Sequence, residues 1–226
     1  MPLFLFDVFG NASIGIYSLV NDQIAILPPQ VPETKRCKAE NWLKVKVIPT
    51  TIGKSVIIGV LAASNSNGII LPPFTEEEEI ETIRSSSDLN IAVMNTKKTA
   101  YGNMVLANDK GAIVGPGLEK EDMNKIKDTL GVEVVSTRIA GLPYVGSLAT
   151  ATNKGVLAHP MLNDEEREVM EDIFKVPVDV GTVNCGIPYV ATGLVANSNG
   201  AVVGQLTTGP EMFIIGHALD VVKENE

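Results

Sequence analysis

Residues 64–72 read SNSNGIILP, a polar turn that ends in glycine and is followed by apolar residues. The same arrangement returns in residues 107–115 (ANDKGAIVG), 151–159 (ATNKGVLAH) and 196–204 (ANSNGAVVG), where the turn glycines are Gly68, Gly111, Gly155 and Gly200. Residues 20–28 (VNDQIAILP) form a fifth copy that lacks the glycine. Successive glycines are 43, 44 and 45 residues apart, so this period accounts for the whole chain of 226 residues. The sequence therefore predicts five repeats of one structural unit.

Each repeat has the same internal pattern. Nine residues before each turn position lies a small residue: Gly15, Gly59, Gly102, Gly146 or Ala191. A polar residue followed by glycine between apolar runs is typical of a β-hairpin, so we expect a strand, a tight turn and a second strand in each unit. A helix should follow, because three of the repeats carry a capping box, with the pairs Thr75 and Glu78, Asn163 and Glu166, and Thr208 and Glu211. Residues 32–43 and 119–130 occupy the equivalent places in the other two repeats.

The ends of the chain indicate how the repeats are joined. Every helix except the last, near 210–222, leads into a further strand, at 45–48, 91–95, 132–136 or 176–180. Residues 3–8 look like a strand with no helix before it, so we expect them to complete the last unit and close the ring. The fold class that follows is a single α+β domain, a closed five-fold ring of ββαβ units. Its repeats span 10–53, 54–98, 99–140, 141–185 and 186–226. Alternating helices and short strands argue against a propeller of four-stranded blades, and closure argues against an open solenoid.

Composition excludes several classes of function. The chain has 18 basic and 27 acidic residues, a net charge of −9, so bulk attraction to nucleic acid is not expected. The longest apolar run, Val56–Ala63, is too short to span a membrane, and the first residues lack the basic region of a secretory signal. Two cysteines fit a reducing compartment, so we expect a cytoplasmic protein. No phosphate-binding loop and no zinc-ligand spacing is present, which predicts neither cofactor nor metal.

Several strings resemble the archaeal and eukaryotic translation initiation factor 6 family over essentially the full length of the chain. They are Thr182-Val183-Asn184, the run 207–211 (TTGPE), Gly102-Asn103, and the run 106–112 (LANDKGA). The resemblance implies the pentein fold, a five-fold pseudosymmetric α/β propeller. It also implies a non-enzymatic factor that binds the large (50S) ribosomal subunit at the intersubunit face and prevents association with the small (30S) subunit. The partner it implies is mainly a ribosomal protein near the sarcin–ricin loop, with a release GTPase as a further candidate, and we expect a monomer.

Pseudosymmetry suggests where such a partner binds. If all five hairpins start at one end of the ring, the residues after the small positions form a circle there: Ile16, Val60, Asn103, Ser147 and Thr192. These residues are uncharged and mostly small or apolar, which suits a protein partner better than nucleic acid. The resemblance matches Asn103 to a family contact, whereas Val60 replaces an arginine of eukaryotic members. Apart from Asn103, each position has an equally good alternative, an ordinary role at the start of a strand.

A basic stretch in the first repeat gives a second candidate. Lys44, Lys46 and Lys54 belong to it and are candidates for contact with ribosomal RNA phosphates, although a solvated face is the simpler interpretation.

Two other classes of function remain open from the residues alone. Penteins include hydrolases and amidinotransferases that act on guanidino groups and need a cysteine, a histidine and carboxylates together. The chain has Cys37, Cys185, His159 and His217, but none stands in the pattern of those enzymes. An enzyme is therefore the less favoured hypothesis. Cys37 fits a packing residue of the first helix, and His159 fits a turn. A general docking scaffold is the third possibility.

Overall fold

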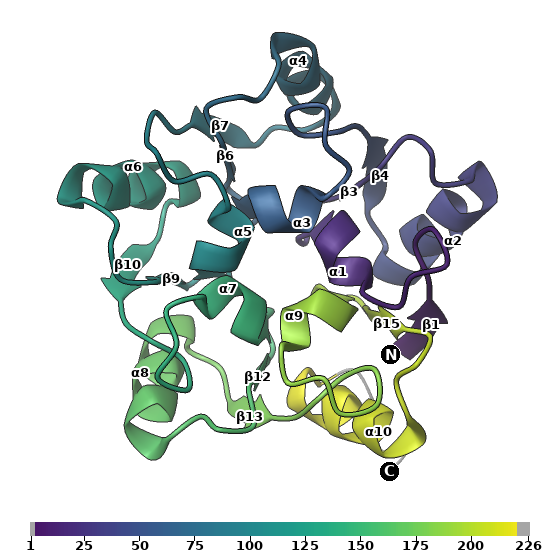
Figure 1. Ribbon diagram of the computed structural model, residues 1–226, viewed down its shortest axis with the longest axis vertical. Helices are drawn as coiled ribbons and strands as arrows, with labels where there is room; N and C mark the ends of the chain where they lie inside the picture. The colour runs from purple at the N-terminus through teal and green to yellow at the C-terminus, as the bar shows by residue number, and fades with distance from the viewer. Residues whose placement is uncertain (1–2, 221–226) are drawn as a thin grey trace.

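The computed structural model describes residues 3–220 and shows a mixed α/β protein. Five three-stranded sheets are arranged around one centre, and the described residues form ten helices (Figure 1). Five of these helices are single turns near the centre: α1 (Ile14–Tyr17), α3 (Ile58–Leu61), α5 (Tyr101–Met104), α7 (Val145–Leu148) and α9 (Val190–Gly193). Five longer helices lie outside the sheets: α2 (Glu33–Leu43), α4 (Glu77–Ser86), α6 (Lys120–Leu130), α8 (Asp164–Phe174) and α10 (Gly209–Ala218).

Each sheet has the order that the repeat predicts. An antiparallel hairpin supplies two strands, and the strand after the outer helix joins the hairpin in parallel. Four of the sheets each consist of three strands that follow one another in the chain. The first is β2 (Leu19–Val20), β3 (Ile24–Leu27) and β4 (Lys46–Pro49), and the second is β5 (Ala63–Ser64), β6 (Gly68–Leu71) and β7 (Asn90–Val93). The third is β8 (Val105–Ala107), β9 (Gly111–Val114) and β10 (Glu133–Ser136), and the fourth is β11 (Ala149–Ala151), β12 (Val156–Ala158) and β13 (Val178–Val180). The central strands are buried throughout, because sheets and helices cover both of their faces.

The fifth sheet joins the two ends of the chain. Its hairpin is β14 (Leu194–Ala196) and β15 (Ala201–Gly204), and its third strand is β1 (Leu3–Phe6) from the N-terminus. Strand β1 pairs in parallel with β15, from Leu3 opposite Ala201 to Phe6 opposite Gly204. The prediction that residues 3–8 complete the last unit is therefore confirmed, with the strand itself covering four residues. The short helices close in the same way, since α1 contacts both α3 and α9.

The only tryptophan of the chain lies where β1 meets the first outer helix. The ring of Trp42 on α2 stacks on Phe4 at 4.3 Å between centroids and meets Phe6 edge-on at 5.9 Å. Trp42 fluorescence should therefore report directly on closure of the ring.

We expect Phe4→Ala to lower the free energy of unfolding by about 2 kcal/mol, because it removes a stacked aromatic pair and leaves a partial cavity. The tryptophan emission should shift to longer wavelength as the ring becomes hydrated. Leu5→Ala on the same strand is the control, since Leu5 is 49% exposed and should change neither quantity appreciably. Unchanged emission in Phe4→Ala would contradict the closure role of this contact.

Two local predictions are wrong. The small residues Gly15, Gly59, Gly102, Gly146 and Ala191 lie in the single-turn helices, and the hairpin strands begin later. The cap of α4 is Glu76, whose box partner is Glu79, whereas the Thr75 hydroxyl donates to the Pro72 carbonyl. The capping boxes of Asn163 with Glu166 and of Thr208 with Glu211 are present as predicted.

The topology gives the ring two different ends. Each hairpin strand starts directly after a short helix and runs to a hairpin turn, so the short helices and the hairpin turns lie at opposite ends. We call these the short-helix end and the hairpin end. The outer helices begin at the short-helix end and finish at the hairpin end, where the Leu43 carbonyl at the end of α2 accepts from Asn197 of a hairpin turn. Loops that precede a short helix or an outer helix therefore belong to the short-helix end.

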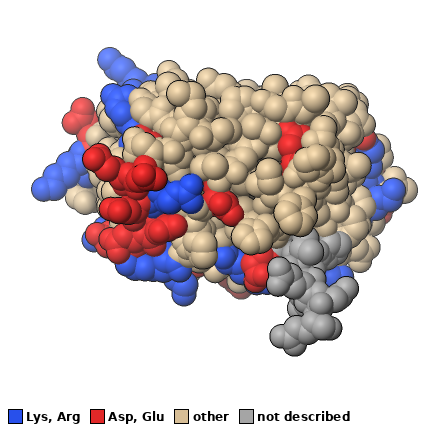
Figure 2. Space-filling view, turned by 90° about the horizontal axis from the view of Figure 1, so that it is seen from below, with Lys and Arg blue, Asp and Glu red and all other residues tan. Residues whose placement is uncertain are grey.

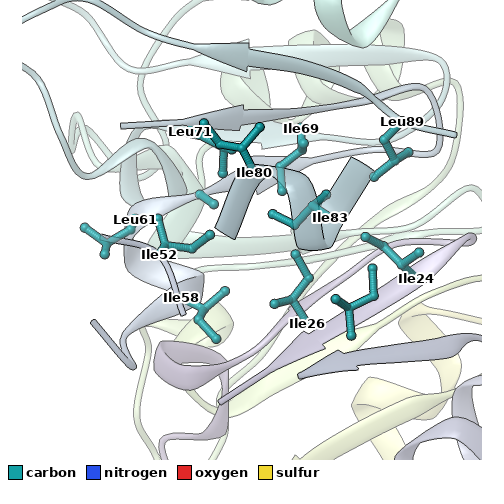
Figure 3. Close-up of a cluster of buried hydrophobic side chains, with 12 residues drawn as sticks. Ile24, Ile26, Ile52, Ile58, Leu61, Ile69, Leu71, Ile80, Ile83 and Leu89 are labelled. Atoms are coloured by element: carbon teal, nitrogen blue, oxygen red, sulfur yellow. The ribbon is translucent and has the colours of Figure 1, made fainter. Parts of the chain in front are cut away.

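The core consists of clusters between neighbouring units. In one of them, Ile24 and Ile26 of β3 face Ile80 and Ile83 of α4, with Ile69 of β6 beyond (Figure 3). Helix α4 thus fills the space between the first and second sheets. Within residues 3–220, no helix is long and apolar enough to cross a membrane.

Candidate functional site

The five residues that the pseudosymmetry singles out do come together. Each occupies the same position of a short helix, and all five line one shallow hollow on the ring axis at the short-helix end. Each is partly exposed, and none carries a charge. We call this set the axial circle: Ile16, Val60, Asn103, Ser147 and Thr192. Asn103 is its only amide side chain.

The glycines beside the axial circle are required by contact between backbones. A Cβ atom at Gly59 or Gly102 would lie 1.9 Å from the carbonyl oxygen of the glycine in the preceding short helix, and at Gly146 the distance would be 2.1 Å. Any side chain at these positions would push two neighbouring units apart. The circle is therefore a rigid surface, because main-chain contacts join α9 to α1, α1 to α3, α3 to α5 and α5 to α7.

Beneath the axial circle lies a cavity of about 110 Å³, lined mainly by small residues of the short helices and first hairpin strands. At the hairpin end, polar side chains close over the axis. The Ser66 hydroxyl donates to Asp109, the Ser198 hydroxyl donates to Asp22, and the Asn153 amide donates to both carboxylates. The two ends therefore differ at the axis, since polar contacts tie the hairpin end together there and the short-helix end presents the uncharged axial circle.

Carboxylates of the outer helices hold loops around the axial circle, a role that we did not predict from the sequence. Glu211 at the start of α10 accepts from the Thr182 hydroxyl at 2.7 Å, the Cys185 N–H at 3.1 Å and the Gly186 N–H at 2.8 Å. It also accepts from the Thr208 N–H at 2.7 Å and from the Thr208 hydroxyl at 2.8 Å. Burial would raise the pKa of Glu211, but these hydrogen bonds outweigh it and hold the pKa at about 2.

Carboxylates at the starts of two other outer helices hold loops in the same way. Glu79 accepts from the Thr51 hydroxyl at 2.5 Å and from the Gly53 and Lys54 N–H groups, and Glu166 accepts from the loop at 140–141. Burial opposes ionisation of Glu79, yet the hydrogen bonds keep its pKa below the ordinary value. The spacing of these acids by the repeat period was the signal that could have identified the role.

The three lysines proposed for RNA contact do not share a surface. Lys54 lies at the short-helix end, where its Nζ pairs with Glu76 at 3.0 Å. Lys44 ends α2 and Lys46 begins β4, so both lie at the hairpin end. Strand β4 runs from one end of the ring towards the other and separates them from Lys54. Proximity in sequence was misleading here, because the chain crosses the whole sheet within a few residues.

The cysteines and histidines are dispersed. Cys37 and Cys185 are both exposed, which corrects the expectation that Cys37 packs in the core. His159 is buried in the turn after β12, where its Nδ1 accepts from the Met161 N–H, so the turn role is confirmed. Burial lowers the pKa of His159. His217 on α10 faces Asp179 at 3.3 Å on the outside of the ring. Residues 3–220 contain no group of three or more His, Cys, Asp or Glu that could hold a metal ion.

The geometry can be compared with known proteins. A family model described as "eIF-6 family" matches residues 4–218, almost the whole of the part described here. The chain belongs to the eIF-6 family. The eIF-6 relatives include a protein of Pyrococcus horikoshii that is 44% identical over 221 residues, covering 96% of this chain and 97% of the relative. One of Staphylothermus marinus is 40% identical over 97% of this chain and 98% of the relative. One of Methanocaldococcus jannaschii is 41% identical over 94% and 96%. All three are named translation initiation factor 6, so this eIF-6 chain belongs to a family of translation initiation factors.

Proposed function

We propose that the chain is a translation initiation factor that binds the large (50S) ribosomal subunit at the intersubunit face and prevents association with the small (30S) subunit. The observation that carries the proposal is the axial circle, an uncharged rigid surface at the end of a closed ring. Membership of the eIF-6 family supports it, and the pentein classification, a five-fold α/β propeller, is part of the same proposal. The partner proposed for the circle is a ribosomal protein near the sarcin–ricin loop. Of the three candidate lysines Lys44, Lys46 and Lys54, Lys54 lies on the same end as the circle.

The mechanism proposed is occupancy. A rigid body on the intersubunit face excludes the small subunit by its volume and needs no catalytic group, so we propose that the factor is not an enzyme. A preorganised surface also loses little conformational entropy on binding, which favours affinity from a modest contact area. A monomer suffices for this action, and a release GTPase would be needed only to remove a factor that dissociates slowly.

Co-sedimentation with separated ribosomal subunits tests the proposal. The protein should travel with the large subunit alone, and addition of small subunits should give less of the joined particle than in a reaction without the factor. Protein that stays at the top of the gradient, with joining unaffected, would refute the proposal.

Replacement of Asn103 by aspartate tests the axial circle itself. The new charge lies on an otherwise uncharged surface and would have to be desolvated on docking, so we expect the affinity for the large subunit to fall by about tenfold or more. Thermal unfolding should not change, because no hydrogen bond holds the Asn103 side chain in the described part of the chain. Asn199→Asp makes the same change at the hairpin end and should bind normally. Equal affinity of the two variants would show that another surface docks.

A further inference from the structure

The contact between two neighbouring units, here called a seam, is made at the axis in the same way at four places around the ring. At the short-helix end, a glycine of one short helix lies against a main-chain carbonyl of the helix before it. A Cβ atom there would lie 1.8 to 2.1 Å from the carbonyl oxygen, at Gly15, Gly59, Gly102 and Gly146. Helix α9 has Ala191 at this position. Because a real Cβ does not approach a main-chain oxygen within 3.0 Å, α9 cannot contact α7 as the other short helices contact one another.

The hairpin end departs from the repeat at the same seam. The asparagine that begins a hairpin turn donates its side-chain N–H to the main-chain carbonyl of the corresponding residue in the next unit. These links are Asn21 to Asn65 at 2.8 Å, Asn65 to Asn108 at 3.1 Å, Asn108 to Thr152 at 3.0 Å and Asn197 to Asn21 at 3.1 Å. In the fourth unit the position is Thr152, whose shorter side chain donates to the Gly155 carbonyl of its own turn at 3.1 Å. The seam between the fourth and fifth units thus departs from the other four at both ends of the axis.

Away from the axis this seam resembles the others. Leu157 of β12 is buried against Val190 and Ile215 of the fifth unit, as Ile113 of β9 is buried against the fourth unit. Such apolar packing is non-directional, so two surfaces joined by it can separate and meet again. On the outside, His217 of α10 faces Asp179 of β13 at 3.3 Å, but both side chains are largely exposed and contribute little. The seams therefore differ in their links at the axis.

The path of the chain allows the two units to separate as intact bodies. Figure 2 faces the fourth and fifth units from the side, with charged residues gathered over α8 and a mostly uncharged surface towards α10. The chain passes between the units after Gly181, whose N–H donates to Ala158 of β12, and before Thr182, whose hydroxyl donates to Glu211. Each of the two sheets lies wholly on one side of the seam, and β1 keeps the fifth unit joined to the N-terminus. Separation there breaks no strand pairing.

We propose that the ring opens at the seam between the fourth and fifth units, by rotation of the main chain near Gly181, while the other four seams stay closed. The closed ring is the ground state, so the axial circle is preorganised, and this opening is the local transition of lowest free energy. Opening moves Thr192 of α9 away from Ser147 of α7 and divides the circle. Where the inference concerns binding it rests on the proposed function: a large subunit docked across the circle holds the seam shut, and an open ring binds more weakly.

Thiol labelling of a buried cysteine measures the opening without any partner. Leu157→Cys places a thiol in the seam, and Ile113→Cys is the matched control at the equivalent position between the third and fourth units. Both native side chains are 0% exposed, and the exposed Cys37 and Cys185 are replaced by serine in both variants. Well below the unfolding temperature, we expect the thiol at position 157 to react at least about tenfold faster. Equal rates, once corrected for the stability of each variant, would overturn the proposal.

Restoring the missing links provides a second test that leaves the buried side chains of the seam intact. Thr152→Asn with Ala191→Gly gives this seam the residues of the others. The new amide is placed to reach the carbonyls of Asn197 and Leu219, as Asn108 reaches two carbonyls at the seam before it. We expect a higher unfolding temperature, although glycine in place of alanine destabilises a helix, and slower labelling of the seam thiol. An unfolding temperature at or below that of the wild type would overturn the proposal.

Labelling in the presence of large subunits separates the opening from the proposed function. Saturation with large subunits should slow the reaction of Leu157→Cys at least about tenfold, because binding selects the closed ring. If the protein binds and the rate does not change, docking does not depend on the closed seam, and the coupling is overturned. If the protein fails to bind, the proposed function fails and the coupling with it, while the rates measured without subunits still decide whether the seam opens.

Discussion

Glu211→Ala is expected to lower the free energy of unfolding by about 3 kcal/mol or more, because several donors lose a charged acceptor at once. The Glu211 side chain is 7% exposed and accepts five hydrogen bonds from the loop at 182–186 and from Thr208. Without the carboxylate, buried main-chain donors lose their acceptor while remaining out of water. Chemical denaturation monitored by Trp42 fluorescence would measure the change.

The pH dependence of stability provides a check on this interpretation. The pKa of Glu211 is about 2 in the folded protein and lies near the ordinary 4.5 when the chain unfolds. Because the folded pKa is the lower one, the stabilisation is complete above pH 4.5 and is lost as the pH falls towards 2, by about 3 kcal/mol in all. The difference in stability between the wild type and Glu211→Ala should shrink across this window. A constant difference would contradict the assigned role of the carboxylate.

Much of the ring could be predicted from the sequence because its strongest signals are local and repeated. The turn glycines at a fixed period, the apolar strands after them and the capping residues each depend on a few neighbouring residues. Closure by residues 3–8 could be predicted because the last unit lacked its third strand, while the N-terminal strand belonged to no other unit. Such reasoning does not depend on knowing any distance.

The errors concern features that depend on residues far apart in the chain. Glu79, three positions into α4, reaches back to the loop at 51–54, and this contact moves the cap from Thr75 to Glu76. The single-turn helices have only four residues each, too few to give a helical period. Lys46 and Lys54 are close in sequence, but β4 carries the chain between the two ends of the ring. A linear pattern contains no information on which end of a strand a residue faces unless the topology is already known.

The candidate site could likewise be predicted only in part. The axial circle was found by extending the register of the repeat, which works because every unit contributes the same position. The loop-holding role of Glu79, Glu166 and Glu211 escaped that approach, although these acids recur with the repeat period. Their hydrogen-bond donors lie in loops 25 to 29 residues earlier in the chain, and only the folded structure brings the two together.

Gly102→Ala is expected to destabilise the protein by about 3 kcal/mol, because the new Cβ would overlap the main chain of a neighbouring unit. The Cβ would lie 1.9 Å from the Gly59 carbonyl oxygen and 2.8 Å from the Ala62 carbonyl oxygen. Helix propensity alone predicts the opposite sign, a gain of about 1 kcal/mol for alanine in a helix. The sign of the change in the free energy of unfolding, measured by urea denaturation, therefore shows which effect is larger, the overlap with the neighbouring main chain or the gain in helix propensity.

Gly209→Ala is the matched control, since it also places alanine in a helix but meets no atom within 4 Å. It should be neutral or slightly stabilising. Gly102→Ala should also weaken binding to the large subunit, because relief of the overlap moves α5, and Asn103 with it, away from α3. Asn103→Asp, by contrast, should reduce binding without reducing stability. If Gly102→Ala loses stability but binds normally, the rigid position of Asn103 does not determine affinity, and the docking energy must come from other residues of the short-helix end.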